Sequence, residues 1–281
     1  MTDEGFAPTH TLLHVSDTHL TPSDVNAPPL SQVRPFEQFD RLASSIEASG
    51  VRIDAIVMSG DLANDGEAEA YRRIRDRVSR LADAGGAEIT WVMGNHDDRS
   101  AFRAGLLDDA SGSTEPVESV TEVKGLRIIS LDTSVPGSNH GEIRASQLEW
   151  LANVLREPAP AGTLIAMHHP PLHSPIDVLR QFGLRDTEGL AEVIRNTDVR
   201  SILVGHYHYS SFGMFAGVPV SVASSTSHTQ DLRVQHPGMR VVNGAQAANL
   251  VHVYPNQVVH SVVPVATHPV LQAVPADDTA G

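Results

Sequence analysis

Short apolar runs rich in Val, Ile and Leu recur along this chain, and segments with the periodicity of amphipathic helices separate the early ones. The apolar runs, each of which predicts a strand, cover residues 11–15, 55–58, 89–93, 126–131, 163–167, 202–204, 218–223 and 249–254. The helical segments cover residues 36–48, 67–84, 145–156 and 188–195. Because strands that alternate with helices form sheets covered by those helices, the pattern predicts an α/β fold with a largely buried sheet.

The pattern changes after about residue 198, where the helical periodicity stops and strand-like runs follow one another. Antiparallel strands that complete a second sheet would give this order. We therefore predict a four-layer α/β/β/α sandwich, formed as a single domain over residues 1–266. Residues 267–281 are small, polar and proline-containing, a composition typical of a disordered tail.

Charge limits the function classes. The chain has 281 residues, with 20 Lys and Arg against 34 Asp and Glu, which gives a formal net charge of −14. Nucleic acids and anionic membranes bind clustered Lys and Arg, so this balance argues against both partners. A small phosphorylated substrate is compatible with it if a metal supplies local positive charge.

Three absences in the sequence add to these limits. No stretch approaches the roughly 18 uninterrupted apolar residues of a membrane-spanning helix. The start, MTDEGFAPTH, lacks the basic and apolar segments of a leader, so a cytoplasmic protein is expected. The chain has no cysteine but 15 histidines, so metal ligands must be histidines and carboxylates, and disulfides are excluded.

Five polar clusters stand directly after predicted strands. They read DTH at residues 17–19, GDL at 60–62, GNHD at 94–97, HHP at 168–170 and GHYH at 205–208. Open α/β sheets bind ligands at such strand ends. Aspartate can bridge two metal ions, imidazole suits Zn, Fe, Mn and Co, and an Asn carbonyl adds an oxygen without charge. The clusters therefore predict a two-metal site, and the glycines before Asp61, Asn95 and His206 predict tight turns.

Each cluster also has a structural explanation when it is taken alone. Asp17 could belong to a turn beside a surface histidine, and Asp61 could cap a helix. Asn95 could occupy a left-handed turn, and the two histidines of GHYH could alternate across a strand end with one of them in the core. Five such coincidences at successive strand ends are hard to produce by packing alone, so the joint pattern favours the metal site.

The clusters also form an ordered series: DTH, GDLANDG, GNHD, HHPP and GHYH match DxH, GDxxxxG, GNHD, HHPP and GHxH. This series resembles that of the calcineurin-like metallophosphoesterase superfamily, and the resemblance runs from residue 12 to about residue 265. WVMGNHDDR, LRIISLDTSVPG followed by HGEIRASQLEWL, PVSVAS and NLVHVYP are similar to the class III cyclic-nucleotide phosphodiesterases of mycobacteria. Asn64 stands where related enzymes often carry Asp, which puts a role for that carboxylate in question.

The resemblance implies a metallophosphoesterase-type sandwich that holds two metal ions per chain, Fe or Mn in first place and Zn or Co as alternatives. It assigns one ion to Asp17, His19, Asp61 and His208. It assigns the other ion to Asp61, which bridges the pair, with Asn95, His168 and His206. The residues alone predict the clusters but do not divide them between two ions.

The implied activity is hydrolysis of 3′,5′-cyclic nucleotides, cyclic AMP to AMP above all, by in-line attack of a hydroxide that bridges the metals. His96 would be the catalytic residue, which contacts the phosphate without binding metal and protonates the leaving oxygen. Asn95, His140 and His208 would bind substrate with it, although a surface loop histidine is the alternative for His140. A glycerophosphodiesterase or a broad phosphomonoesterase of the same superfamily is the alternative activity.

The remaining polar residues have simpler predicted roles. Asp97 and His169 adjoin the implied ligands and are predicted to orient ligand imidazoles, although a structural hydrogen bond is the alternative for His169. Eight other histidines are predicted to be ordinary core or surface residues: His10, His14, His173, His228, His236, His252, His260 and His268. The resemblance also implies a homodimer. A nuclease is disfavoured because the acidic chain offers no basic groove, and a non-catalytic scaffold is disfavoured because every ligand position is present.

Overall fold

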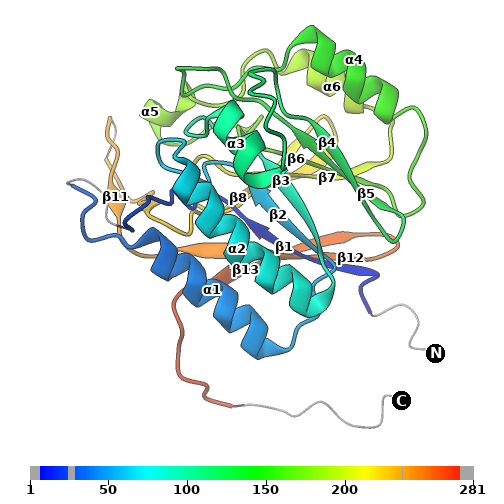
Figure 1. Cartoon of the computed structure of the whole chain (residues 1–281). Helices are drawn as coiled ribbons and strands as arrows, with labels where there is room; N and C mark the ends of the chain where they lie inside the picture. Colours follow the sequence, from blue (N-terminus) through cyan, green and yellow to red (C-terminus); the bar gives the residue numbers. More distant parts are fainter. Residues whose placement is uncertain (1–6, 25–28, 236, 273–281) are drawn as a thin grey trace, which may run out of the picture.

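A computed structural model gives the structure of residues 7–24, 29–235 and 237–272 (Figure 1). His236 and residues 273–281 of the predicted tail lie outside these ranges. Residues 267–272, the described part of that tail, are exposed and form neither helix nor strand. Within the described ranges, no helix is long and apolar enough to cross a membrane.

Strands and helices alternate in the first half of the chain. Its elements are β1 (His10–Val15), α1 (Pro35–Ser49), β2 (Ala55–Ser59), α2 (Ala68–Gly85), β3 (Glu88–Val92), α3 (Arg99–Leu106), β4 (Ser119–Val123), β5 (Leu126–Leu131) and α4 (Ala145–Val154). Amphipathic spacing explains the long helices, since α2 buries Ile74, Val78 and Leu81 on one face. The helix ends at Gly86, whose φ of 66° is left-handed.

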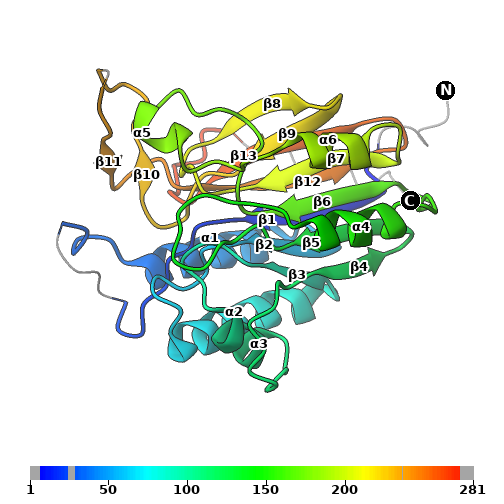
Figure 2. The same cartoon turned by 90° about the horizontal axis from the view of Figure 1, so that it is seen from above.

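The second half of the chain is dominated by strands. Its elements are β6 (Thr163–Met167), α5 (Asp177–Arg180), α6 (Glu188–Ile194), β7 (Val199–Val204), β8 (Ser211–Phe215), β9 (Val218–Val222), β10 (Thr229–Gln230), β11 (Val241–Val242), β12 (Ala247–Val253) and β13 (Val258–Pro264). No helix follows α6 in the described residues, as the sequence predicts. The short β10–β11 pair projects at one end of the molecule, beside α5 (Figure 2).

Two large sheets form the centre of the molecule. The first has the order β13-β12-β1-β2-β3, with β1, β2 and β3 parallel and with β12 antiparallel to both β1 and β13. The second has the order β4-β5-β6-β7-β9-β8, with parallel pairing from β5 to β9 and an antiparallel strand at each edge.

Alternate residues of the central strands point into different hydrophobic cores. Val57 of β2 and Leu164 of β6 belong to the core between the two sheets. Ile56, on the other face of β2, packs with the apolar residues of α1 and α2, and Ile165 of β6 packs with those of α4 and α6. Figure 1 shows α1 and α2 on one side of the strands and α4 and α6 on the other. The predicted four-layer α/β/β/α sandwich is confirmed.

The strands after residue 198 are distributed differently from the prediction. Among the strands after residue 198 in the second sheet, β9 lies parallel to β7, and only β8 is antiparallel to its neighbour. The last two strands extend the first sheet instead, where Leu12 of β1 pairs with Val251 of β12. The burial of β12 explains its place, because most of its residues are shielded from water and a position between β1 and β13 provides that cover.

The parallel arrangement brings the polar clusters to one place. β1, β2 and β3 end at the same edge of the first sheet, and β6 and β7 end at the same edge of the second. Within the first sheet, the N–H of Asp17 donates to the carbonyl of Gly60 at 3.0 Å. Between the sheets, the N–H of His206 donates to the Asp17 carboxylate at 2.9 Å. All five clusters therefore meet at one end of the sandwich.

Candidate metal centre

Ligand-type side chains from both sheets converge at these strand ends. They form two groups, and within each group all the ligand atoms lie within 4.8 Å of one another. The first group is Asp17, His19, Asp61 and His208, and the second is His168, His169 and His206. All of them are buried except His206, which is partly exposed. The groups contain every predicted Asp and His ligand, and they also contain His169, which was not predicted to be a ligand.

Asp61 lies between the two groups. Its Oδ2 atom is 3.6 Å from Nε2 of His19 in the first group and 3.2 Å from Nε2 of His168 in the second. Within the first group, Nε2 of His208 is 3.2 Å from Oδ1 of Asp17. A carboxylate that faces both groups can bind two cations at once, which is what bridging requires.

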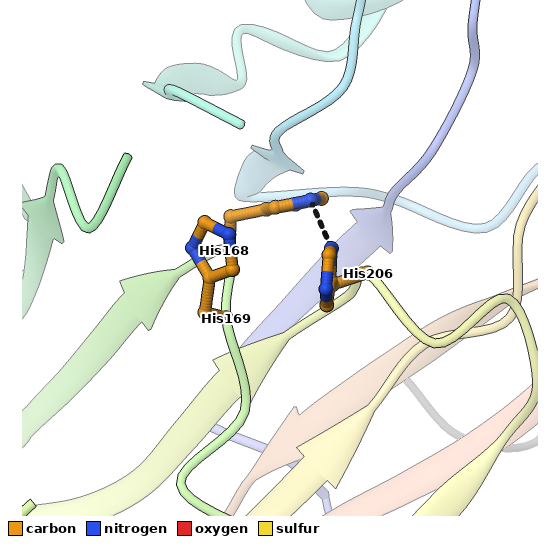
Figure 3. Close-up of side chains that lie close together, drawn as sticks. All are labelled: His168, His169 and His206. Carbon is orange, nitrogen blue, oxygen red and sulfur yellow. Dashed lines mark hydrogen bonds between the residues drawn. The ribbon is translucent and has the colours of Figure 1, made fainter. Parts of the chain in front are cut away.

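The second group joins the ends of β6 and β7 (Figure 3). Nδ1 of His206 lies 3.2 Å from Nε2 of His168, and the ring of His169 is 4.6 Å from that of His206. The Thr133 hydroxyl holds Nδ1 of His169 at 2.8 Å. Thr133 therefore orients His169, and the ring of His169 packs against the ring of His206.

The donor atoms of the site fit cations. Buried atoms without a hydrogen-bond partner among the described residues include Nδ1 of His19, Oδ1 of Asn95, Nε2 of His169 and Nε2 of His206. Leaving such atoms unpaired is unfavourable. The facing Nε2 atoms of His19 and His208 are 3.1 Å apart, where they can share at most one proton. A cation would supply a partner for Oδ1 of Asn95 and for the ring nitrogens that face one another, and imidazole, carboxylate and amide donors suit Fe, Mn, Zn or Co.

Hydrogen bonds from the far side of two rings orient them toward the centre. Nδ1–H of His168 donates to the carbonyl of Ser59 at 2.8 Å, and Nδ1–H of His208 donates to the carbonyl of His228 at 2.9 Å. Because a carbonyl only accepts, both bonds fix the tautomer and leave Nε2 for a metal.

The backbone at the ligands is strained. Asp17, His19, Asp61, His206 and His208 all have φ between 44° and 71°, a left-handed region that residues other than glycine rarely occupy. Such conformations cost of order 1 kcal/mol or more each and persist where the surrounding structure holds them, most often at functional sites. The strand ends thus turn sharply to aim their side chains inward.

The glycines before the ligands serve different purposes. Gly60 has a φ of 94°, as the predicted tight turn requires. Gly94 and Gly205 lie outside the left-handed region, so the turn explanation is wrong for them. A Cβ on Gly94 would collide with Asp61, and a Cβ on Gly205 would collide with the Ser16 hydroxyl. These two positions need glycine because neighbouring strand ends pack directly against their backbone.

Burial and the close approach of charges set the protonation of the site. Burial opposes ionisation of Asp17, but the facing imidazoles, that of His208 first, hold its pKa well below the ordinary value. Burial acts to lower the pKa of His168, but the carboxylates of Asp61 and Asp17 outweigh it and raise this pKa to about 9. Burial lowers the pKa of His206 to about 3. Asp17 is therefore ionised and His206 is neutral, which are the forms in which these side chains bind metal.

His96 stands beside the first group without joining it. Its ring packs edge-on against that of His19, with centroids 4.8 Å apart. Its Nδ1–H donates to the backbone carbonyl of Asn64 at 2.7 Å, so Nε2 is the ring atom left for a substrate. The Asn64 side chain donates instead to Asp65. The presence of Asn in place of Asp at position 64 therefore leaves this support of His96 intact.

Asp97 has a different role from the predicted one. Its carboxylate accepts hydrogen bonds from the N–H of Leu62 at 3.1 Å, the N–H of Gly94 at 2.9 Å and the hydroxyl of Tyr71 at 2.9 Å. It therefore ties the loops after β2 and β3 together, and the prediction that it orients an imidazole is wrong. Burial, with the nearby charge of Asp61, raises the pKa of Asp97 to about 6.

Two further histidines lie near the centre. Nε2 of His140 is 2.9 Å from a carboxylate oxygen of Glu142, and its contact with substrate stays a prediction. His228 packs its ring 4.5 Å from that of His208 and 5.4 Å from that of His19, so the prediction of an ordinary histidine is wrong for it. The polar run SSTSH at residues 224–228 begins two residues after the last residue of β9, and this is the signal that could have found it.

Comparisons with known proteins agree with this geometry. The family described as calcineurin-like phosphoesterase matches residues 10–210. A cAMP/cGMP dual specificity phosphodiesterase of Mycobacterium tuberculosis is 53% identical over 257 residues, which cover 92% of this chain and 80% of that protein. A probable cyclic nucleotide phosphodiesterase of Rhodococcus erythropolis is 46% identical over 274 residues, 97% of this chain and 90% of that protein. A dimetal phosphatase structure from Danio rerio has a TM-score of 0.63 at 16% identity, covers 92% of this chain and 97% of that one, and shares the fold.

Proposed function

Because the chain belongs to the calcineurin-like phosphoesterase family, we propose that it is a metal-dependent phosphodiesterase that hydrolyses 3′,5′-cyclic nucleotides, cyclic AMP to AMP in particular. The observation that carries the proposal is the pair of ligand groups with Asp61 between them. The names of the two relatives, both cyclic nucleotide phosphodiesterases, support the substrate class.

Two ions would be held at these groups. Asp17, His19, Asp61 and His208 would hold one ion, and Asp61, Asn95, His168 and His206 would hold the other, without His169 of the second group. Fe and Mn are the proposed pair, with Zn and Co as alternatives. Bound ions of this kind polarise phosphoryl oxygens and lower the pKa of a coordinated water.

The chain's own residues bind and orient the substrate beside the ions. The Nδ1–H of His96 is committed to Asn64, so any proton that this ring gives to the leaving oxygen must come from Nε2. Oδ1 of Asn95 is buried without a partner and would bind a metal, which would leave the amide nitrogen to donate to a phosphoryl oxygen. His208 and His140 are the other proposed substrate contacts.

A matched substrate panel tests the proposal. Mn-loaded protein would be assayed on 3′,5′-cyclic AMP, 2′,3′-cyclic AMP, glycerophosphocholine and 4-nitrophenyl phosphate. We expect preference for 3′,5′-cyclic AMP, loss of this activity in Asn95→Ala, and full activity in Asn153→Ala, which removes an exposed Asn of α4. Preference for the glycerol diester or the monoester would overturn the substrate assignment and favour a glycerophosphodiesterase or phosphomonoesterase.

Two further properties are proposed. The enzyme acts in the cytoplasm, and, on the family resemblance, it forms a homodimer. A light-scattering mass equal to the 30.1 kDa of one chain would rule out the dimer.

A further inference from the structure

A cleft of about 500 Å³ opens beside the metal groups. Residues 95–99, which include Asn95 and His96, form one wall, and segments around residues 114–115 and 134–137, together with Arg144, form the rest. Sites for small molecules commonly have volumes of about 300–1,000 Å³. Because Asn95 and His96 are the proposed phosphate contacts, the part of the substrate beyond the phosphate would enter this cleft.

A single buried guanidinium fixes both outer walls of the cleft. Arg99 is 6% exposed, and its Nη1 donates to the carbonyl of Thr114 at 3.0 Å while its Nη2 donates to the carbonyl of Ser134 at 2.9 Å. Its Nε donates to the buried carboxylate of Asp132 at 2.9 Å. The cleft is therefore held open by the fold before any ligand arrives.

The lining of the cleft combines apolar and charged groups. Val135 and Pro136 contribute apolar surface. At the rim, Nη1 of Arg144 is 3.1 Å from a carboxylate oxygen of Glu115, and both side chains are more than half exposed. A purine base has the matching character, with two apolar faces and an edge of hydrogen-bond donors and acceptors.

A second cleft also touches Asn95 and His96 but is less suited to a base. It has a volume of about 380 Å³, and the rest of its lining is Asn64, Asp65, Gly137, Ser138 and Asn139. None of these residues offers an apolar side chain against which a ring could stack.

We propose that the cleft around Arg144 binds the nucleoside part of the substrate. The base lies against Val135 and Pro136, with its edge toward Glu115 and Arg144. Glu115 accepts from an amino group, and Arg144 donates to ring nitrogen or oxygen, so the pair accommodates adenine and guanine alike. This inference rests on the proposed function and assigns the choice of nucleotides over other diesters to this cleft.

Substitutions at the rim test the role of the charged pair. The variants Arg144→Ala and Glu115→Gln would be assayed on 3′,5′-cyclic AMP and on methyl 4-nitrophenyl phosphate, a diester without a base. We expect the ratio of the two kcat/KM values to fall about tenfold in Arg144→Ala, mainly through KM, which is the effect of losing one charge-assisted hydrogen bond. Arg72→Ala, which removes another exposed Arg from an ion pair, here with Glu69, should leave the ratio unchanged.

An unchanged ratio in both rim variants, or an equal loss on both substrates, would overturn the inference. Binding of adenosine gives a readout that does not depend on turnover. Saturation-transfer NMR should detect the base protons of adenosine on the wild-type protein and a weaker signal on Arg144→Ala. No transfer to wild type at millimolar adenosine would overturn the cleft assignment. If the wild-type protein hydrolyses no cyclic nucleotide, the proposed function is wrong. The adenosine signal still tests the cleft assignment in that case.

Discussion

Removing Arg99 from its buried ion pair with Asp132 should cost the fold a large part of its stability. Arg99→Met removes the Nε bond to Asp132 and the donors to the carbonyls of Thr114 and Ser134. Asp132 is fully buried, so its charge would keep only the bonds from Val117 and Ser134. Removing one partner of such a pair costs about 3–5 kcal/mol, against a total stability of about 5–15 kcal/mol for a typical domain.

Urea unfolding followed by circular dichroism, at a fixed metal concentration, measures this loss. Arg99→Met/Asp132→Asn should be more stable than Arg99→Met alone, because the double variant leaves no buried charge without a partner. Arg99→Lys keeps the charge but loses the planar fork, so its free energy of unfolding should lie between those of Arg99→Met and wild type. This variant tests the reasoning if Arg99→Met does not fold. Arg72→Met, in an exposed pair, should cost less than about 1 kcal/mol. A loss in Arg99→Met no larger than that of Arg72→Met would refute the reasoning.

Three further predictions follow from the site and the core. His96→Ala should keep the metal content of wild type by elemental analysis while kcat falls at least about 100-fold, and loss of metal would contradict its place outside the ligand groups. Gly205→Ala should bind less metal than wild type, since its Cβ would collide with Ser16; full metal content would show that the strand ends tolerate the methyl group. Burial lowers the pKa of His260 to about 4, whereas a His in the unfolded chain has a pKa near 6.5. Between these two pH values the unfolded chain binds the proton and the folded chain does not, so the free energy of unfolding falls as the pH drops from about 6.5 to about 4. His260→Gln should therefore lose about 2 kcal/mol less than wild type between pH 7 and pH 5 in urea melts, and equal losses would contradict the sign.

The central strands could be predicted from the sequence because they are buried on both faces. β2 and β6 are buried throughout, and each reads as an unbroken apolar run. Edge strands lack that signal. In β8, Phe212 and Met214 are 55% and 63% exposed, and the strand contains a glycine, so nothing in its sequence distinguishes it from a loop. The eight-residue α3 was likewise too short for its periodicity to be seen.

The positions of the candidate ligands could be predicted because each follows a strand, and the topology of parallel strands then places them together. The partners of individual side chains could not. Asp97 adjoins His96 in the sequence, yet its carboxylate contacts backbone from the loop after β2. His228 reaches the centre because a loop after β9 turns back toward His208, a path that local sequence does not encode.

The pairing of β1 with β12 has a consequence for the newly made chain. Every candidate metal ligand lies between residues 17 and 208, so all of them exist before β12, at residues 247–253, has been synthesised. Until then the outer edge of β1 presents a row of unpaired N–H and C=O groups, a template for association with another chain. The last two strands contribute no candidate ligand; β12 covers the edge of β1, and the free edge of the finished sheet is then β13.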